Sequence, residues 1–232
     1  LLAQGAGVRL APIWSPDSRR VLYDTDRRTI TDIFEMDVDG SGIEKTVLAT
    51  EEFESPSDLS MDGRFLAYNH SGSRNTRQSD VFILPLDGDR KLFPFQATDA
   101  DEFGGQFSPD GKWLLYGSDE SGTDECYVRP FPSGEGRYRI TTFEVGYGCW
   151  WGDDGGEILY VDQDSNVVSV SVATSPSFRV ETPRPLFKIP NLVSIHSPRD
   201  GKRFAAVVRE EAGATPPVSF VSDWRPRTGT PH

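Results

Sequence analysis

Aspartate residues at a regular spacing are the first feature of this chain that could carry chemistry. Successive members of the set lie 45, 48, 44 and 46 positions apart, each in or beside a Ser-Pro-Asp-Gly-like segment. A ring of carboxylates could bind a cation, but Asp before Gly in a tight turn accepts hydrogen bonds from nearby backbone N–H groups. Catalysis also needs one asymmetric site rather than repeated copies. We therefore predict a structural role in turns for Asp17, Asp62, Asp110, Asp154 and Asp200.

Metal and cofactor chemistry have weak support in the sequence. The three histidines are isolated and lack the paired spacing of a zinc site. The segment 162–166 reads Asp-x-Asp-x-Asn and so begins like a calcium loop. Its sixth position, however, is Val167 rather than Gly, and its twelfth is Ala173 rather than Glu. A polar turn is the better interpretation, and we expect no metal and no cofactor.

Nucleophilic catalysis also lacks support. No Gly-x-Ser-x-Gly segment is present, and the two cysteines, Cys126 and Cys149, fall on predicted strands of different repeats. Cysteines on buried strands behave as small apolar side chains. We predict inert buried thiols, with a disulfide between them as the less favoured alternative. No catalytic residue is expected.

An apolar run after each aspartate predicts the β-strands that position these residues. In four copies a tyrosine stands six residues after the Asp: Tyr23, Tyr68, Tyr116 and Tyr160. The runs are short and rich in aromatic and β-branched residues, which is typical of buried strands. The tyrosines are predicted to pack between sheets with their hydroxyls at a polar rim. The strand before the turn is predicted to add core residues at Trp14, Phe107 and Trp151.

Four antiparallel strands that repeat about every 45 residues indicate a β-propeller blade. The predicted fold is all-β, a propeller of about five four-stranded antiparallel blades within a single domain at residues 1–225. The predicted blades cover residues 8–50, 51–98, 99–143, 144–188 and 189–225, and residues 226–232 are expected to be a disordered tail. Residues 1–4 resemble the end of a strand. Either they close the fifth blade and complete a ring, or the chain is a fragment of a larger propeller.

Composition excludes several functional classes. The chain has 232 residues, 36 acidic and 24 basic, for a formal net charge of −12. Such a charge disfavours nucleic acid, because like charges repel the phosphates. The longest uninterrupted apolar stretch, Phe204–Val208, is far shorter than the ~18 residues of a membrane span. We therefore expect neither membrane insertion by this chain nor a signal peptide within it.

Segments that lead into the innermost strand of each blade ring one end of a propeller channel, and here they are mostly acidic. This channel mouth is predicted to carry a negative potential and to favour a protein or peptide partner with basic segments. Ordinary solvated loops are the alternative interpretation. The predicted binding residues are Arg9, Glu54, Asp101, Glu102, Glu144 and Tyr147.

The segments Trp14–Tyr23 and Phe107–Tyr116 resemble the TolB-like propeller repeat. In addition, segments 84–91, 106–113, 127–132 and 183–187 are similar to the C-terminal region of bacterial serine/threonine protein kinases that carry such repeats. This resemblance implies a sensor on the extracytoplasmic side, with a kinase domain elsewhere in the parent protein. The chain itself lacks the glycine-rich loop and the His-Arg-Asp and Asp-Phe-Gly motifs of a kinase.

The expected function is therefore non-catalytic recognition of a protein or peptide. Two alternatives stay open at this point. The propeller could gate substrates for a peptidase or another hydrolase, or it could bind a small molecule such as a sugar.

Overall fold

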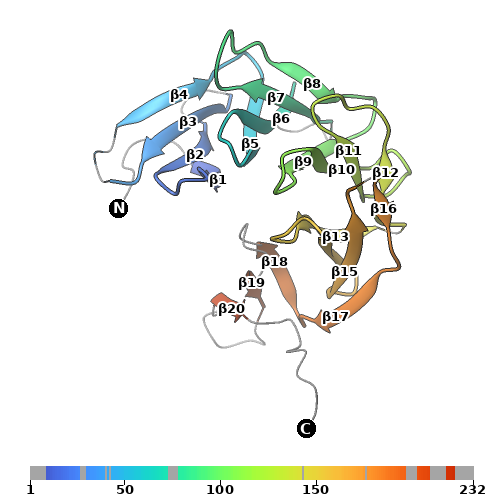
Figure 1. Ribbon diagram of the computed structural model, residues 1–232. Helices are drawn as coiled ribbons and strands as arrows, with labels where there is room; N and C mark the ends of the chain where they lie inside the picture. The colour runs from blue at the N-terminus through green and yellow to red at the C-terminus, as the bar shows by residue number, and fades with distance from the viewer. Residues whose placement is uncertain are drawn as a thin grey trace. The chain divides into compact units, whose positions relative to one another are not determined.

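The computed structural model describes residues 9–26, 30–39, 41, 43–72, 78–142, 144–175, 177–196, 203–209 and 218–222. The regular elements in these ranges are β-strands, which form five antiparallel sheets (Figure 1). The chain divides into two compact units, Leu1–Arg139 and Ile140–His232. No part of the described chain forms a helix capable of crossing a membrane.

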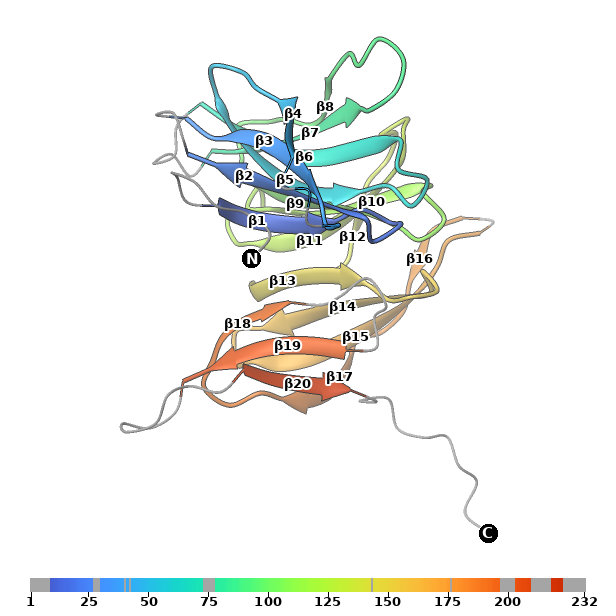
Figure 2. The same cartoon turned by 90° about the vertical axis from the view of Figure 1, so that its left-hand side faces the viewer.

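The first unit contains three four-stranded sheets in which consecutive strands pair. The first sheet consists of β1 (Arg9–Trp14), β2 (Arg20–Thr25), β3 (Asp32–Asp37) and β4 (Glu44–Leu48), which follow one another in this order in Figure 2. The second consists of β5 (Phe53–Leu59), β6 (Phe65–Ser71), β7 (Asp80–Pro85) and β8 (Phe93–Gln96). The third consists of β9 (Glu102–Phe107), β10 (Trp113–Ser118), β11 (Glu125–Pro130) and β12 (Tyr138–Arg139). Strands β1, β5 and β9 lie on the inner side of this unit, and β4 and β8 on its outer side (Figure 1).

The second unit contains the fourth and fifth sheets. The fourth consists of β13 (Val145–Trp151), β14 (Glu157–Asp162) and β15 (Asn166–Ala173), whose outer edge pairs with both β16 (Arg179–Val180) and β17 (Arg184–Lys188). In the described residues the fifth sheet has three strands, β18 (Leu192–His196), β19 (Arg203–Val208) and β20 (Val218–Ser222). The repeat of the sequence thus corresponds to one sheet.

Neighbouring sheets of the first unit are joined by apolar side chains. Leu59 and Tyr68 of the second sheet form one buried cluster with Leu22 and Ile33 of the first. Each fully buried side chain of this size stabilises the fold by roughly 1.5–3 kcal/mol relative to its exposed state. Because a blade cannot cover both of its faces alone, this stacking is what makes the repeat stable.

The third sheet packs on the second in the same way. Phe107 and Tyr116 cluster with Val81 and Ile83 of the second sheet. Gly105 on β9 marks a close approach of the two sheets, since a Cβ atom there would lie 2.8 Å from Val81 Cγ1. The predicted fold class, an all-β propeller built from about five four-stranded antiparallel blades, is confirmed.

A bulge recurs where each inner strand pairs with its neighbour. The register shifts within the pairs β1–β2, β5–β6 and β9–β10. Ala11 and Gly104 adopt positive φ angles of 44° and 69° at these positions. A bulge bends a strand and turns its side chains. The inner strands are therefore bent at these register shifts.

The tyrosines of the repeat are core residues. Tyr68, Tyr116 and Tyr160 are fully buried, and burial raises the pKa of Tyr116 and of Tyr160 to about 12. The prediction that they pack between sheets agrees with the clusters of the first unit. The prediction that their hydroxyls reach a polar rim is wrong for these three, because side chains with so little exposed area end inside the protein.

Trp14 departs from the predicted core. Its side chain is 53 % exposed, whereas Phe107 and Trp151 at equivalent positions are buried. In the first unit an inner-strand residue is covered by the sheet before it, as Leu59 is covered by Leu22 and Ile33. Among the described residues of this unit no sheet precedes the first one, which accounts for the exposure of Trp14.

The two cysteines are not free thiols. Cys126 on β11 and Cys149 on β13 are disulfide-bonded. The prediction of inert buried thiols is therefore wrong. It rested on the usual behaviour of cysteines on buried strands, which does not exclude an oxidised state.

Some predictions concern residues beyond the described ranges. The proposed closing strand at residues 1–4, the tail at residues 226–232 and the turn residue Asp200 belong to this group.

Candidate functional site

The repeated aspartates hold the turns between the first and second strands of their sheets. In the second sheet the Ser60 hydroxyl donates to Asp62 Oδ1 over 2.6 Å, and the same oxygen accepts the N–H of Arg64 at 3.1 Å. Ser60 Oγ in turn accepts the N–H of Phe65 at 2.9 Å. The hydrogen bond from Ser60 is the largest cause that lowers the pKa of Asp62 below its usual value.

The same turn occurs in the first and third sheets. The hydroxyls of Ser15 and Ser108 donate to Asp17 and Asp110 over 2.6 and 2.7 Å. In the fourth sheet glycine replaces the serine, and Asp154 accepts only the N–H of Gly156, at 2.9 Å, among the hydrogen bonds described there. Each of these four carboxylates serves its own turn. We call this end of the first unit's sheets the turn end, and the opposite end, where β5 and β9 begin, the loop end.

Two of the predicted binding residues at the loop end are buried rather than exposed. Glu54 is 0 % exposed, and its backbone N–H donates to the Thr31 carbonyl at 3.1 Å. Its carboxylate accepts the Thr50 hydroxyl at 2.6 Å and lies 3.2 Å from Nδ1 of His70. Burial raises the pKa of Glu54, and the contacts with Thr50 and His70 oppose this rise.

Glu102 repeats this arrangement in the third sheet. Its N–H donates to the Ser79 carbonyl at 2.8 Å, and its carboxylate accepts the hydroxyl and the backbone N–H of Thr98. Gln96 Nε2 also donates to this carboxylate, at 3.3 Å. Glu102 is fully buried, so it holds the turn that leads into β9 and presents no side-chain surface to a partner.

The other predicted binding residues have varied surroundings. Asp101 is half-buried, and its Oδ1 accepts the N–H and the hydroxyl of Ser79 at 2.9 and 2.8 Å. Glu144 is exposed and accepts a hydrogen bond from Gln163 within the second unit. Arg9 lies on β1 and Tyr147 on β13, and their side chains are beyond the described part of the structure.

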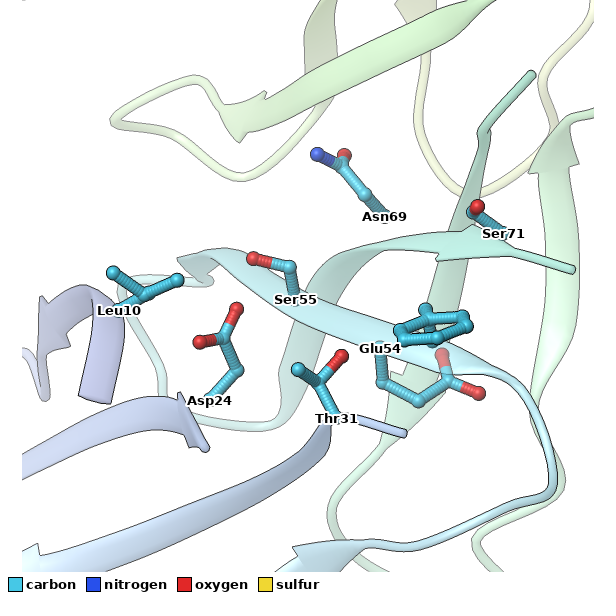
Figure 3. Close-up of a pocket in the computed structure, with 8 residues that line it drawn as sticks. Leu10, Asp24, Thr31, Glu54, Ser55, Asn69 and Ser71 are labelled. Atoms are coloured by element: carbon cyan, nitrogen blue, oxygen red, sulfur yellow. The ribbon is translucent and has the colours of Figure 1, made fainter. Parts of the chain in front are cut away.

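A pocket of about 230 Å³ lies between the first and second sheets at the loop end (Figure 3). Its lining comes from β1, β2, the residue before β3, β5 and β6, and consists of Leu10, Asp24, Thr31, Phe53, Glu54, Ser55, Asn69 and Ser71. Asp24 is 4 % exposed, and its carboxylate points toward the space flanked by Leu10 and Ser55 (Figure 3). The Glu54 carboxylate points away from Asp24 in the same view.

Neighbouring hydrogen bonds hold the wall of this pocket. Asn69 Oδ1 accepts the Ser57 hydroxyl at 3.1 Å and the N–H of Gly104 at 3.0 Å, which connects the second sheet to β9. Sequence reasoning missed Asp24, Ser55 and Asn69 as pocket residues. One signal was present: Asp24 and Asn69 each follow the repeat tyrosine, where later copies have Gly117 and Val161.

The described residues contain no group of three or more His, Cys, Asp or Glu side chains that could hold a metal ion. The calcium-like segment at 162–166 is a turn in which Asp162 Oδ1 accepts the N–H groups of Asp164 and Asn166, both at 2.9 Å. Its Oδ2 accepts Asn166 Nδ2 at 2.8 Å. This carboxylate is therefore engaged in closing the hairpin.

Comparisons with known proteins identify the fold. No family model and no curated protein sequence matches this chain. Among solved structures, TolB from Acinetobacter baumannii has a TM-score of 0.67 at 20 % identity, over 94 % of this chain and 52 % of that chain. A protein assigned as TolB from Agrobacterium tumefaciens has a TM-score of 0.73 at 17 % identity, over 96 % of this chain and 80 % of that chain.

Enzymes share the fold as well. A puromycin-hydrolysing peptidase from Mycobacterium tuberculosis has a TM-score of 0.66 at 14 % identity, over 92 % of this chain and 36 % of that chain. The chain thus spans about half the length of the A. baumannii TolB structure and about a third of the peptidase. Similarity at these identities establishes a TolB-like β-propeller fold and leaves function to the site itself.

Proposed function

We propose that this chain is a non-catalytic binding module that recognises basic segments of a protein or peptide at the loop end of its first unit. One observation carries the proposal: the pocket between the first two sheets lies at the same end as the acidic turns that lead into β5 and β9. A pocket flanked by surface charge of one sign is a common arrangement for recognition of an oppositely charged partner.

The charge of the two turns supports a basic partner. Residues 49–52 and 97–101 together contain four acidic residues and no basic one. Glu51 and Asp99 are exposed, so their charges can attract a basic partner that approaches from solvent. At the turn end, by contrast, Asp87 lies 3.0 Å from Arg64 Nε and Asp110 lies 3.9 Å from Lys112 Nζ, and these pairs offset part of the charge.

The proposal extends to the parent protein. The kinase-like segments described above suggest that the chain is the sensor region of a bacterial receptor-like serine/threonine kinase, on the extracytoplasmic side. The disulfide-bonded cysteines support this location, because disulfides persist in oxidising compartments and are rare in the cytosol.

The test measures binding of a fluorescent peptide that alternates Lys and Ser, beside a peptide of equal length that alternates Glu and Ser. We expect saturable binding of the basic peptide only, weakened by added salt. The double variant Glu51→Lys/Asp99→Lys should raise the Kd about tenfold or more, since two attractive charges become repulsive. The matched control is Asp89→Lys at the turn end, which should leave the Kd unchanged. Equal binding of both peptides, or equal effects of both variants, would overturn the proposal.

A further inference from the structure

We infer that His70 makes the turn at residues 49–52 a pH-sensitive switch, ordered while the Glu54–His70 pair holds a proton and loosened when the pair releases it. The inference goes beyond the proposed function, because it concerns the protein alone and needs no partner. The observation behind it is a row of three side chains across the second sheet at the loop end. Glu54 on β5 pairs with His70 on β6, and His70 pairs with Asp80 on β7.

The same row in the neighbouring sheets has no imidazole at its centre. In the third sheet Ser118 stands between Glu102 and Glu125. In the first sheet the central position is Thr25. Residues directly opposite one another on antiparallel strands lie side by side on one face. Histidine is the side chain whose ordinary titration falls between about pH 5 and about pH 8. Of these three sheets, the second therefore places a group that titrates near neutral pH between two acids.

The contacts of His70 connect its charge to the turn. Its Nδ1 lies 3.2 and 3.3 Å from the two carboxylate oxygens of Glu54, and its ring packs on that of Phe82 with 4.6 Å between the ring centroids. Glu54 Oε1 accepts the Thr50 hydroxyl at 2.6 Å, and Thr50 Oγ1 accepts the N–H of Glu52 at 3.0 Å. The imidazole and the turn thus share one carboxylate, which belongs to a residue that is 0 % exposed.

The electrostatic surroundings favour a proton on this pair. Burial raises the pKa of Glu54 and of Asp80, and the charge of His70 acts on both carboxyls to lower it. A proton on the imidazole therefore compensates two carboxylates that burial disfavours. The described titratable groups near His70, from its own strand and from the neighbouring elements, are Tyr68, Glu52, Glu54, Asp80, Asp101 and Glu102, and none of them is a base.

Loss of the proton changes the state of the turn. At low pH the pair is protonated, and the Glu54 carboxylate holds Thr50 beside a compensating cation. As the pH rises the proton passes to solvent, which the imidazole reaches because its side chain is 27 % exposed. The buried carboxylate then lacks a counter-charge, which is costly away from water. Opening of the turn lets water reach the carboxylate, so the order of the turn is complete at low pH and is lost as the pair deprotonates.

The experiment measures amide hydrogen exchange and imidazole titration by NMR in the intact chain, between about pH 5 and about pH 8. The reporter is the N–H of Glu54, which donates to the Thr31 carbonyl at 3.1 Å. Exchange is expressed as a protection factor, corrected for the intrinsic effect of pH on exchange. We expect protection to fall about tenfold or more, which corresponds to a change of one unit in the proton affinity of the pair. The fall should have the same midpoint as the titration of the His70 imidazole, whose signal is identified by its loss in His70→Gln.

The third sheet supplies a control within the same molecule. The N–H of Glu102 donates to the Ser79 carbonyl at 2.8 Å, as that of Glu54 does to Thr31, but Ser118 replaces the histidine there. Protection of the Glu102 amide should stay level over this pH range. This comparison is made in the wild-type chain and does not depend on the folding of any variant.

Two variants test the coupling. Asp80→Asn removes one of the two acids beside the imidazole, so the imidazole titration and the fall at residue 54 should move together to lower pH. Glu54→Gln removes the buried charge, so the protection at residue 54 should stay level while the imidazole still titrates. The matched controls are His196→Gln, which removes an exposed imidazole in the second unit, and Asp89→Asn, which removes an exposed acid at the turn end. Both controls should keep the wild-type profile.

The opposite results would overturn the inference. If protection at Glu54 falls at a pH where the imidazole does not titrate, the carboxyl group acts alone and His70 is no switch. A fall of equal size at Glu102, or no fall at Glu54, would overturn it as well. These measurements use no peptide. Failure of the Lys-Ser peptide to bind would therefore count against the proposed function and leave the switch intact.

Discussion

The carboxylate of Asp58 on β5 accepts a hydrogen bond from the backbone N–H of Phe107 on β9 at 3.0 Å. Both residues are buried, and they lie 49 positions apart in the sequence. The bond therefore connects the inner strands of the second and third sheets, beside the apolar cluster that contains Phe107. It supplies an acceptor for a backbone N–H group of β9, which is the edge strand of the third sheet.

Asp58→Ala should destabilise the first unit by about 1–3 kcal/mol, because it leaves the Phe107 N–H buried without an acceptor. Asp58→Asn keeps an acceptor oxygen at the same place and should cost less. Urea unfolding measures the loss, and hydrogen exchange of the Phe107 amide measures it locally. Unchanged exchange at Phe107 in the alanine variant would show that this bond does not connect the sheets.

Glu54 should make stability depend on pH. Its pKa is raised in the folded protein, chiefly by burial, so the folded state holds the proton more tightly than the unfolded state. Its contribution to stability is therefore complete below the unfolded-state pKa and is lost as the pH rises through the raised native pKa. His70 and Glu52 also act on this carboxyl, the first lowering and the second raising its pKa.

Glu54→Gln cannot titrate and should flatten the fall of the unfolding free energy that begins as the pH rises above the usual pKa of a glutamate. The Gln side chain can still meet Thr50 and His70, so the fold should survive. Glu51→Gln, at an exposed position three residues away, is the control and should keep the wild-type slope. An identical slope in Glu54→Gln and wild type would assign the pH dependence to other groups.

The sheets could be predicted from the sequence because the residues that define each hairpin lie within one copy of the repeat. The Ser-x-Asp turn and the tyrosine six residues after the Asp act within one hairpin, so their effect does not depend on distant residues. Tyr68 and Tyr116 lie where the pattern predicts, in the clusters between sheets. Trp14 shows the limit of such a pattern, since its burial depends on a covering sheet rather than on its own strand.

The loop end could be predicted only in part. Glu54 and Glu102 follow turns, so the sequence predicts that they are exposed to solvent. Both are buried, and the backbone N–H of each donates to a carbonyl beside the preceding sheet, at Thr31 and Ser79. These contacts cross between repeats, and spacing within one repeat does not reveal them. A local signal did exist, because a threonine stands four residues before each of the two glutamates.

The turn between β5 and β6 allows a test of how much a local hydrogen-bonded motif contributes to the stability of the fold. Ser60 is buried, donates to Asp62 and accepts the N–H groups of Arg64 and Phe65. Ser60→Ala removes these hydrogen bonds at once and should cost about 1–3 kcal/mol of unfolding free energy, since the N–H of Phe65 loses its side-chain acceptor while the N–H of Arg64 keeps Asp62. Ser121→Ala, at an exposed position in the same unit, should change stability by no more than about 0.5 kcal/mol.

The same variant should change the titration of Asp62. The hydrogen bond from Ser60 is the main cause of the lowered pKa of this carboxyl, so Ser60→Ala should move the pKa back up toward its usual value. In wild type the stabilisation from Asp62 is present above its unfolded-state pKa and is lost as the pH falls through the lowered native pKa. A side-chain NMR titration of Asp62 in both proteins measures the difference. If the pKa stays equally low without the serine hydroxyl, then the backbone N–H of Arg64 and the charges around the turn, rather than Ser60, hold the carboxylate in its ionised form.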